Sequence, residues 1–454
     1  MNSVLPPSSK RDDPLDSLLD PLLDASFKGF PHAAVPLRRS AIGQQGWNVL
    51  RGDLPFPVAV IRAEALNANV SWMQGFARAQ GLEMAPHGKT TMSPQLFRRQ
   101  LDAGAWGMTV ANVTQLKVAL AAGARNCLIA NQVFAANDLA QIDRILRLDR
   151  LHCVQPGLRI VFLVDSLAQL ACIDRWHADA KRSGEPEPLE VLLEVGVPGG
   201  RTGCRDHAQA MALARAVKAS PAVRLVGLEC YEGLGATGQS KADQAYASAL
   251  MQRLNAVARE CDALGLFEAE EVLMSAGGSG IFDLVAPHLK PVLNHTIGRP
   301  VRGLLRSGCY ITHDQGSYKR LVGAVTARLG CGDGLHAALE VWAAVQSVPE
   351  PGLAILTVGK RDISYDQEMP TPLRYSPMKG RLQLKAPPTW RISAMNDQHA
   401  YLRWPIDPSA AAPLQVGDLL CLGLSHPCTT FDKWRWMPLV DEDCNVIDAI
   451  TTNF

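Results

Sequence analysis

Residues 223–264 read VRLVGLECYEGLGATGQSKADQAYASALMQRLNAVARECDAL. Of the whole chain, this segment shows most clearly the pattern of a strand followed by a helix. The segment opens with a nearly continuous apolar run, Val223–Cys230, which is typical of a parallel strand covered on both faces. Apolar side chains then recur every three or four residues, at Tyr246, Leu250, Leu254, Val257, Cys261 and Leu264. That spacing places them on one face and predicts an amphipathic helix. A buried strand leading into such a helix is the repeating unit of α/β proteins.

The same unit recurs on both sides of this segment. Further strand candidates are Val58–Ile61, Leu82–Ala85, Gly107–Ala111, Cys127–Ala130, Ile160–Val164, Leu189–Val195, Val272–Ser275 and Val292–Ile297. Most of them lead into a helical period, as Val58–Ile61 does before Leu66 and Val70. About eight such units in roughly 250 residues predict a (β/α)8 TIM barrel within the α/β class. A doubly wound open sheet is the alternative that this pattern leaves open.

The pattern becomes β-rich after about Tyr318. The strand candidates there are Leu321–Leu329, Ala338–Val348, Ala354–Val358, Leu382–Leu384 and Leu419–Leu424, separated by turns rich in proline and glycine. We therefore expect a C-terminal β-rich domain beside the barrel. The predicted division is an N-terminal arm over residues 1–50, the barrel over 51–317 and the β-rich domain over 318–454.

The composition excludes several classes of partner. Lysine and arginine number 45 against 44 aspartates and glutamates, so the formal charge is +1, without the basic excess that nucleic acids or membrane surfaces attract. The 11 cysteines are scattered, which indicates free thiols in a reducing compartment rather than a disulfide framework. No apolar run reaches the roughly 18 residues of a membrane span, and the N-terminus lacks a signal-peptide pattern. We expect a cytoplasmic protein whose partners are small molecules or copies of itself.

Two segments at strand ends could carry chemistry inside the barrel. Lys89 lies in Pro86-His87-Gly88-Lys89-Thr90, after an early strand, at the edge where barrels build their active sites. An amine held in a partly desolvated pocket can form a Schiff base, although a surface lysine is the plainer interpretation. The run Ser275–Gly280, with Gly277, Gly278 and Ser279 at its centre, follows a late strand. Its backbone amides could bind a phosphate, or it could be a flexible turn.

Two further pairs of residues are candidates for ligand contacts. Arg201 and Tyr231 each follow a strand, so an arginine and a phenol could face the barrel mouth. His426 and Cys428 stand two residues apart after the strand candidate Leu419–Leu424, and both side-chain types bind zinc. A two-residue site would need water, substrate or distant ligands to complete it. A packed cysteine beside an unrelated histidine is the alternative.

In this order along the chain, these segments resemble the D-serine dehydratase and D-threonine aldolase group of fold-type III pyridoxal-phosphate (PLP) enzymes. The resemblance runs from about Pro57 to the C-terminus, and it is strongest to bacterial amino-acid deaminases and low-specificity D-serine/D-threonine dehydratases. It implies the alanine-racemase architecture of a barrel plus a β-domain, and frequently a homodimer. The implied activity is conversion of a small β-hydroxy D-amino acid to a 2-oxo acid and ammonia.

The resemblance also implies roles for the residues at the barrel mouth. Lys89 matches the lysine that carries PLP as a Schiff base, and His87 lies in the same cofactor-binding motif. Arg201 matches an arginine near the phenolic oxygen of PLP, and Tyr231 matches a tyrosine near its pyridine nitrogen.

The phosphate and metal sites are implied in the same way. Gly277, Gly278 and Ser279 match the loop that binds the phosphate of PLP. His426 and Cys428 match a metal pair in which zinc, or another divalent metal, assists loss of the β-hydroxyl. The related aldolases usually have an aspartate in place of Cys428, which favours the dehydratase.

Two departures and several alternatives accompany this interpretation. Ala85 and Thr91 stand where many relatives have an arginine and a second histidine, so the roles of those side chains do not carry over.

A D-threonine aldolase, which cleaves Cα–Cβ to glycine and an aldehyde, is the nearest alternative. A racemase would leave the His426/Cys428 pair unexplained, and a non-catalytic PLP carrier would not need the β-rich domain. A barrel hydrolase that uses only a metal would leave Lys89 without a role.

Overall fold

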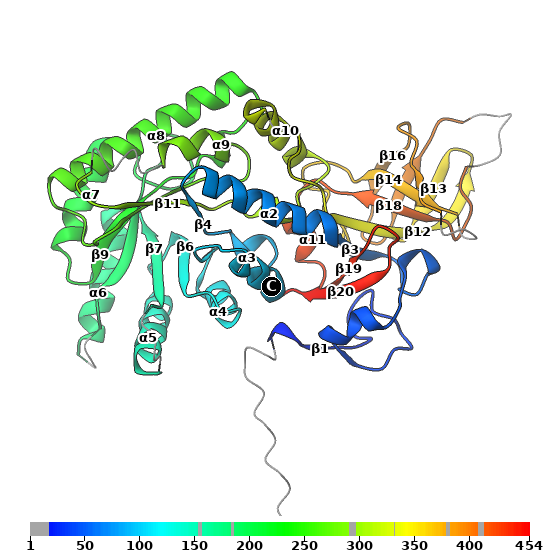
Figure 1. The fold of residues 1–454 in the computed structure, drawn as a ribbon, viewed down its shortest axis with the longest axis horizontal. Helices are drawn as coiled ribbons and strands as arrows, with labels where there is room; N and C mark the ends of the chain where they lie inside the picture. Colours follow the sequence, from blue (N-terminus) through cyan, green and yellow to red (C-terminus); the bar gives the residue numbers. More distant parts are fainter. Residues whose placement is uncertain are drawn as a thin grey trace, which may run out of the picture.

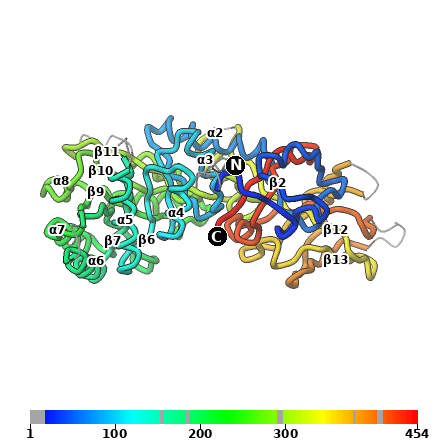
Figure 2. Tube along the Cα trace, turned by 90° about the horizontal axis from the view of Figure 1, so that it is seen from below, coloured from blue at the N-terminus to red at the C-terminus, as the bar shows by residue number. Residues whose placement is uncertain are grey.

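The computed structural model describes residues 18–152, 157–182, 186–289, 297–330, 332–377, 382–406 and 413–454. It consists of two units side by side, a curled parallel sheet surrounded by helices and a mainly antiparallel β unit (Figure 1). Seen from below, the two units lie at opposite ends of an elongated molecule, and the N-terminal segment lies on the β unit (Figure 2). None of the described helices has both the length and the apolar character needed to cross a membrane.

The first unit is built on eight parallel strands. They are β4 (Glu83–Met84), β5 (Met108–Val110), β6 (Asn126–Gln132), β7 (Arg159–Val164), β8 (Leu189–Glu194), β9 (Val223–Glu229), β10 (Val272–Ala276) and β11 (Val301–Leu305). The order across the sheet is β4-β11-β10-β9-β8-β7-β6-β5, and the two ends meet in a parallel bridge between His87 and Thr109. The predicted α/β barrel with a β-rich C-terminal part is therefore confirmed.

Helices cover the outside of this sheet. They are α2 (Ala63–Ala79), α3 (Pro94–Asp102), α4 (Val113–Ala121), α5 (Ala136–His152), α6 (Leu167–Ala180), α7 (His207–Ala219), α8 (Ser240–Ala263), α9 (Phe282–Val285) and α10 (Ser317–Leu329). Four begin at a polar residue whose side chain accepts a hydrogen bond from the first turn, namely Ser93, Asn112, Ser166 and Asp206. Short 3-10 helices include η1 (Arg39–Gln44), η2 (Val49–Arg51), η3 (Gly88–Thr90), η4 (Gly233–Gly235), η5 (Ala286–His288) and η7 (Cys309–Ile311).

The second unit is a large, mostly antiparallel sheet. Its strands are β3 (Val58–Arg62), β12 (Leu339–Glu350), β13 (Leu353–Leu356), β14 (Thr371–Ser376), β15 (Leu384–Lys385), β16 (Arg391–Met395), β17 (Ala400–Arg403), β18 (Leu419–Gly423), β19 (Trp436–Val440) and β20 (Val446–Thr451). The main path runs β15-β14-β18-β12-β13-β17-β16. The short helix α11 (Cys428–Phe431) follows β18, and β1 (Leu22–Leu23) pairs with β2 (Leu37–Arg38) in a separate ribbon.

The first strand candidate lies in the second unit rather than in the barrel. Residues 58–62 form β3, which pairs antiparallel with β12 and parallel with β19. Val58 and Val60 join a core with Trp342, whereas Ala59 and Ile61 join the main core, so both faces of β3 are buried. An apolar run buried on both faces looks the same in a barrel and in a mixed sheet. The prediction that this strand opens the barrel was therefore wrong.

Two other expected strands need comment. Residues 321–329, predicted as a strand, belong to helix α10. Tyr318, Val322 and Val325 are buried at helical spacing, and Gly330 ends the helix with a φ of 64°. A helical period was thus misread as an apolar strand. The predicted strand Val292–Ile297 lies, except for its last residue, outside the described residues, and the eighth strand of the sheet is β11.

Packing inside the barrel decides where a ligand can lie. Its interior is filled by Leu128, Val161, Leu163, Leu192, Val226, Leu273 and Leu304, all almost completely buried. The barrel is therefore a packed core rather than a pore, and open space remains only beyond the strand ends. The β unit contributes to the same region, because α11 contacts η3 at the start of the first barrel loop.

Candidate active site

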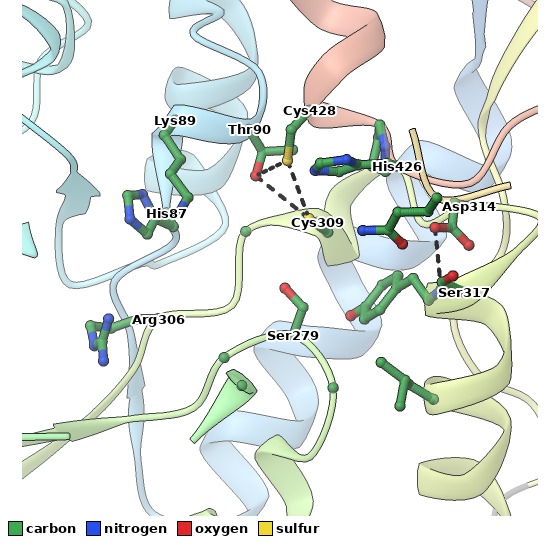
Figure 3. Close-up of a pocket in the computed structure, with 18 of the residues that line it drawn as sticks. His87, Lys89, Thr90, Ser279, Arg306, Cys309, Asp314, Ser317, His426 and Cys428 are labelled. Atoms are coloured by element: carbon green, nitrogen blue, oxygen red, sulfur yellow. Dashed lines mark hydrogen bonds between the residues drawn. The ribbon is translucent and has the colours of Figure 1, made fainter. Parts of the chain in front are cut away.

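The carboxyl ends of the barrel strands border a cavity of about 260 Å3. Its walls come from the loops after β4, β9, β10 and β11 and from the loop after β18 of the β unit. Figure 3 shows Lys89, Ser279, Cys309, His426 and Cys428 around this space. Residues far apart in the sequence therefore meet where the two units join.

Lys89 stands on η3, one short turn after the closing bridge of the barrel. Its side chain is exposed to the cavity, and among the described residues it forms neither a hydrogen bond nor an ion pair. Gly88 packs directly on Phe97 of α3, where an added Cβ would lie 2.5 Å from the ring atom Cζ. The turn is thus fixed by close packing, while the amine at its end stays available to a ligand.

His87 offers a neutral imidazole beside this lysine. Burial, together with the positive charges of Lys89 and Arg306, holds the pKa of His87 well below its ordinary value. Its Nδ1 atom is buried and has no hydrogen-bond partner among the described residues. A buried polar atom without a partner is costly, and a bound polar ligand would satisfy it.

A buried ion pair lies at the base of the cavity. Arg306, directly after β11, donates hydrogen bonds to Glu229 and to the carbonyl oxygen of Cys230, the latter at 2.9 Å. Burial raises the pKa of Glu229 to about 8, against the attraction of Arg306. Arg306 Nε and Glu229 Oε2 have no partner among the described residues. No local pattern in the sequence predicts this pair, because only barrel closure brings the two residues together.

The glycine loop after β10 is only partly free to bind an anion. The backbone N–H groups of Gly277 and Gly278 both donate to the buried carboxylate of Glu232. Gly278 also lies against Tyr231, whose ring atom Cε2 would be 2.8 Å from an added Cβ. Ser279, in contrast, directs its hydroxyl into the cavity (Figure 3). The glycine pattern alone does not reveal that the Glu232 carboxylate accepts from these two N–H groups.

Tyr231 separates the main cavity from a smaller one. The guanidinium of Arg201 lies over the Tyr231 ring, with Cζ 5.2 Å from the ring centre. Arg201 lines the smaller cavity together with Glu194, whereas Tyr231 lines both. The structure therefore brings Tyr231, but not Arg201, to the wall of the main cavity. Burial raises the pKa of Tyr231, so its phenol is neutral.

His426 is held in one orientation at the mouth of the cavity. Its Nδ1 lies 2.5 Å from a carboxylate oxygen of Asp366, and Thr429 Oγ1 donates to the other oxygen at 3.0 Å. The backbone of His426 has a φ of 147°, which L-residues rarely adopt, as is frequent at functional positions. With Nδ1 engaged, Nε2 is the atom left for a ligand.

Cys428 lies at the cavity wall beside a second thiol. Its Sγ is 3.6 Å from Sγ of Cys309 and 3.5 Å from Oγ1 of Thr90. Across the described ranges, no three histidine, cysteine, aspartate or glutamate side chains are already grouped to hold one metal ion. The structure thus brings Cys428 and His426 to one cavity, and adds Cys309, which was not among the candidate residues predicted from the sequence.

Comparison with known proteins gives the family. The model described as "Alanine racemase, N-terminal domain" matches residues 61–292, just over half of the chain. The chain belongs to this family. A second model, described as "Putative serine dehydratase domain", matches residues 338–440 of the β unit. The expected resemblance to the D-serine dehydratase and D-threonine aldolase group of fold-type III PLP enzymes is thereby confirmed.

Two curated relatives match 83% and 49% of the chain at low identity. The D-threonine aldolase of Arthrobacter sp is 26% identical over 83% of this chain and 86% of its own length. The D-threo-3-hydroxyaspartate dehydratase of Delftia sp. (strain HT23) is 28% identical over 49% of this chain and 53% of its own. Among solved structures, the D-threonine aldolase of Filomicrobium marinum has a TM-score of 0.70 at 22% identity, covering 90% of this chain and 97% of that one. The shared fold thus extends over both units.

Proposed function

We propose that this chain is a PLP- and zinc-dependent dehydratase that converts β-hydroxy D-amino acids, such as D-serine and D-threonine, to a 2-oxo acid and ammonia. The observation that carries the proposal is the meeting of Lys89, from the barrel, with His426 and Cys428, from the β unit, around one cavity. The named relatives are aldolases and dehydratases of hydroxy amino acids, which supports a lyase of the same general type. Cys428, at a position where the related aldolases usually have aspartate, favours the dehydratase.

The residues of the cavity fit PLP. Lys89 has an amine without a partner among the described residues, and His87 Nδ1 and Arg306 Nε are buried polar atoms without partners there. Ser279 adds a hydroxyl donor on the glycine loop. When bound, PLP supplies an electron sink for bonds broken at the Cα of an amino acid. The cavity of about 260 Å3 is slightly smaller than the usual ligand site of about 300–1,000 Å3, so it would take only a small ligand.

Lys89 has two tasks in this proposal. Its ε-amino group would hold the cofactor, and the same amine would serve as the base that takes the proton from the Cα of the substrate. His87 beside it is neutral, so it places no positive charge next to the amine that must accept that proton. Tyr231 is also neutral and would leave the pyridine nitrogen of PLP unprotonated. The ring would then withdraw electrons less strongly, so metal assistance to loss of the β-hydroxyl would matter more.

His426 and Cys428 would hold the zinc ion. The donor set of imidazole nitrogen and thiol sulfur is the one that zinc prefers. Asp366 fixes the tautomer of His426, in the carboxylate–histidine arrangement that is common beside metal ligands. Zinc would act as a Lewis acid on the β-hydroxyl, which is otherwise a poor leaving group.

Asp366→Asn is expected to weaken zinc binding by roughly 10–100-fold, the usual effect of changing an outer partner of a metal ligand. An amide can still hydrogen-bond to Nδ1 of His426, but it no longer increases the basicity of the ring. Zinc affinity is measured by competition with a chelator. Asp397→Asn, an exposed aspartate paired with Arg361 away from the cavity, is the matched control. Equal affinity in both variants would contradict the assigned role of Asp366.

Gly88→Ala is expected to lower turnover by roughly 100-fold, because displacing a catalytic group by about 1 Å has effects of this size. The new methyl group would overlap the ring of Phe97 and shift the turn that carries Lys89. Steady-state kinetics of the holoenzyme measure the effect, and Gly75→Ala, with open space around it, is the control. The double variant with Phe97→Leu should recover part of the loss. If Gly88→Ala alone behaves like wild type, the turn is not held by this contact.

Product analysis tests the proposed reaction. Protein supplied with PLP and zinc is incubated with D-serine, D-threonine and their L-forms, and 2-oxo acid, ammonia and glycine are assayed together. Oxo acid and ammonia from the D-forms alone are expected. Glycine and an aldehyde would move the chain to the aldolases, and turnover of the L-forms would overturn the stereochemical part.

Two broader expectations remain predictions. The resemblance implies a homodimer, which light scattering of the purified protein would test. A cytoplasmic location, expected from the free thiols, would be tested by fractionation of the source cells.

A further inference from the structure

Two thiols from different units meet at the cavity wall. Cys309 opens η7 after the last barrel strand, and Cys428 opens α11 after β18, 119 residues later in the sequence. Their Sγ atoms lie 3.6 Å apart, and Thr90 Oγ1 is 3.7 Å from Sγ of Cys309 and 3.5 Å from Sγ of Cys428. Figure 3 shows both sulfurs beside the ring of His426. The barrel thus contributes a third side chain that can bind zinc, at the place where the proposed pair lies.

The separation of the two sulfurs has a chemical meaning. Zinc binds thiolates at about 2.3 Å in a tetrahedral arrangement, so two sulfurs on one zinc ion lie about 3.8 Å apart. A disulfide, in contrast, requires about 2.0 Å between the sulfurs. The observed 3.6 Å is therefore close to one edge of a zinc tetrahedron. The same separation lets one thiol hydrogen-bond to the other when no metal is bound, so the two sulfurs need little movement to bind one zinc ion together.

We propose that Cys309 is a zinc ligand of this chain, so that the ion is held by Cys309, Cys428 and His426, with a fourth position open to the substrate. This inference rests on the zinc site of the proposed function and extends it by one residue. Three protein ligands and one open position are the usual composition of catalytic zinc sites, and two cysteines with one histidine form one such set.

The added cysteine ligand changes which metal ions the site prefers to bind. Two thiolates balance the double charge of zinc, and they bind soft or borderline metals far better than magnesium or manganese. The ligand from the barrel would also link the two units through the metal, because Cys428 and His426 belong to the β unit. Zinc binding should therefore stabilise the contact between the two units as well as the site itself.

Zinc X-ray absorption of the holoenzyme counts the sulfur ligands directly, because zinc–sulfur and zinc–nitrogen distances differ, at about 2.3 Å and about 2.0–2.1 Å. The wild type is expected to have two sulfur neighbours, and Cys309→Ser and Cys428→Ser one each. Chelator competition should show that Cys309→Ser loses more affinity than the roughly 10–100-fold typical of outer partners. Cys172→Ser, on α6 and hydrogen-bonded to Arg175, is the matched control and should retain both sulfurs.

The outcomes separate this inference from the proposed function. One sulfur neighbour in the wild type, unchanged in Cys309→Ser, would overturn the role of Cys309 and leave His426 and Cys428 as the site. A wild-type protein that binds no zinc would overturn both. The wild-type spectrum decides the matter even if a variant fails to fold.

Discussion

Lys89→Ala is expected to lose the visible absorbance of bound PLP near ~420 nm, which is a property of the cofactor attached to a lysine. Turnover should fall at least about 1,000-fold, because both the anchor and the general base are removed. No other lysine lines the main cavity among the described residues, so no neighbouring amine can take over. Absorbance spectra and the rate of 2-oxo acid formation measure the two effects.

The control for this variant is another lysine close to the cavity in sequence and space. Lys319→Ala changes an exposed residue of α10, two positions after Ser317, which lines the cavity. It should retain both the absorbance and the turnover of the wild type. A Lys89→Ala protein that keeps its absorbance band would show that PLP is attached elsewhere.

Removal of zinc, or His426→Ala, is expected to reduce elimination by roughly 100-fold or more, the size of a Lewis-acid contribution of a few kcal/mol. The absorbance of PLP should persist, because the cofactor would be held by Lys89 on η3 and by the glycine loop after β10, and not by the zinc ligands. Added zinc should restore activity to the stripped wild type and not to the variant.

His399→Ala serves as the control, because His399 lies between β16 and β17, outside the cavity lining. It should leave both elimination and PLP absorbance unchanged. Full activity of rigorously metal-free wild type would remove zinc from the proposed reaction and leave only the PLP part.

Much of the fold could be predicted because buried parallel strands and amphipathic helices leave distinct periods in the sequence. Residues 223–264 form β9 and α8 much as the pattern predicts. The failures have one common cause. Val58–Ile61 and Leu321–Leu329 are short apolar segments, and periodicity alone cannot assign such a segment to one sheet or distinguish it from a helix. Tertiary packing against Trp342 decided the first case.

The residues of the site also fall into two groups, those that could be predicted from the sequence and those that could not. Lys89, Tyr231 and Ser279 could be placed at one edge because the carboxyl ends of parallel strands meet there. Arg306 and Cys309 gave no such signal. Arg306 matters through its contact with Glu229, 77 residues away, and Cys309 through Cys428 in the other unit. Contacts of this kind depend on barrel closure and on the joining of two units, and no local pattern encodes them.

The attachment of PLP to Lys89 is the claim on which the proposed reaction and the zinc chemistry both depend. The most direct test is to reduce the PLP-loaded wild-type protein with borohydride, digest it and locate the cofactor by peptide mass spectrometry. The account predicts one modified peptide, which contains Lys89. A cofactor on any other lysine, or no fixed cofactor at all, would contradict it.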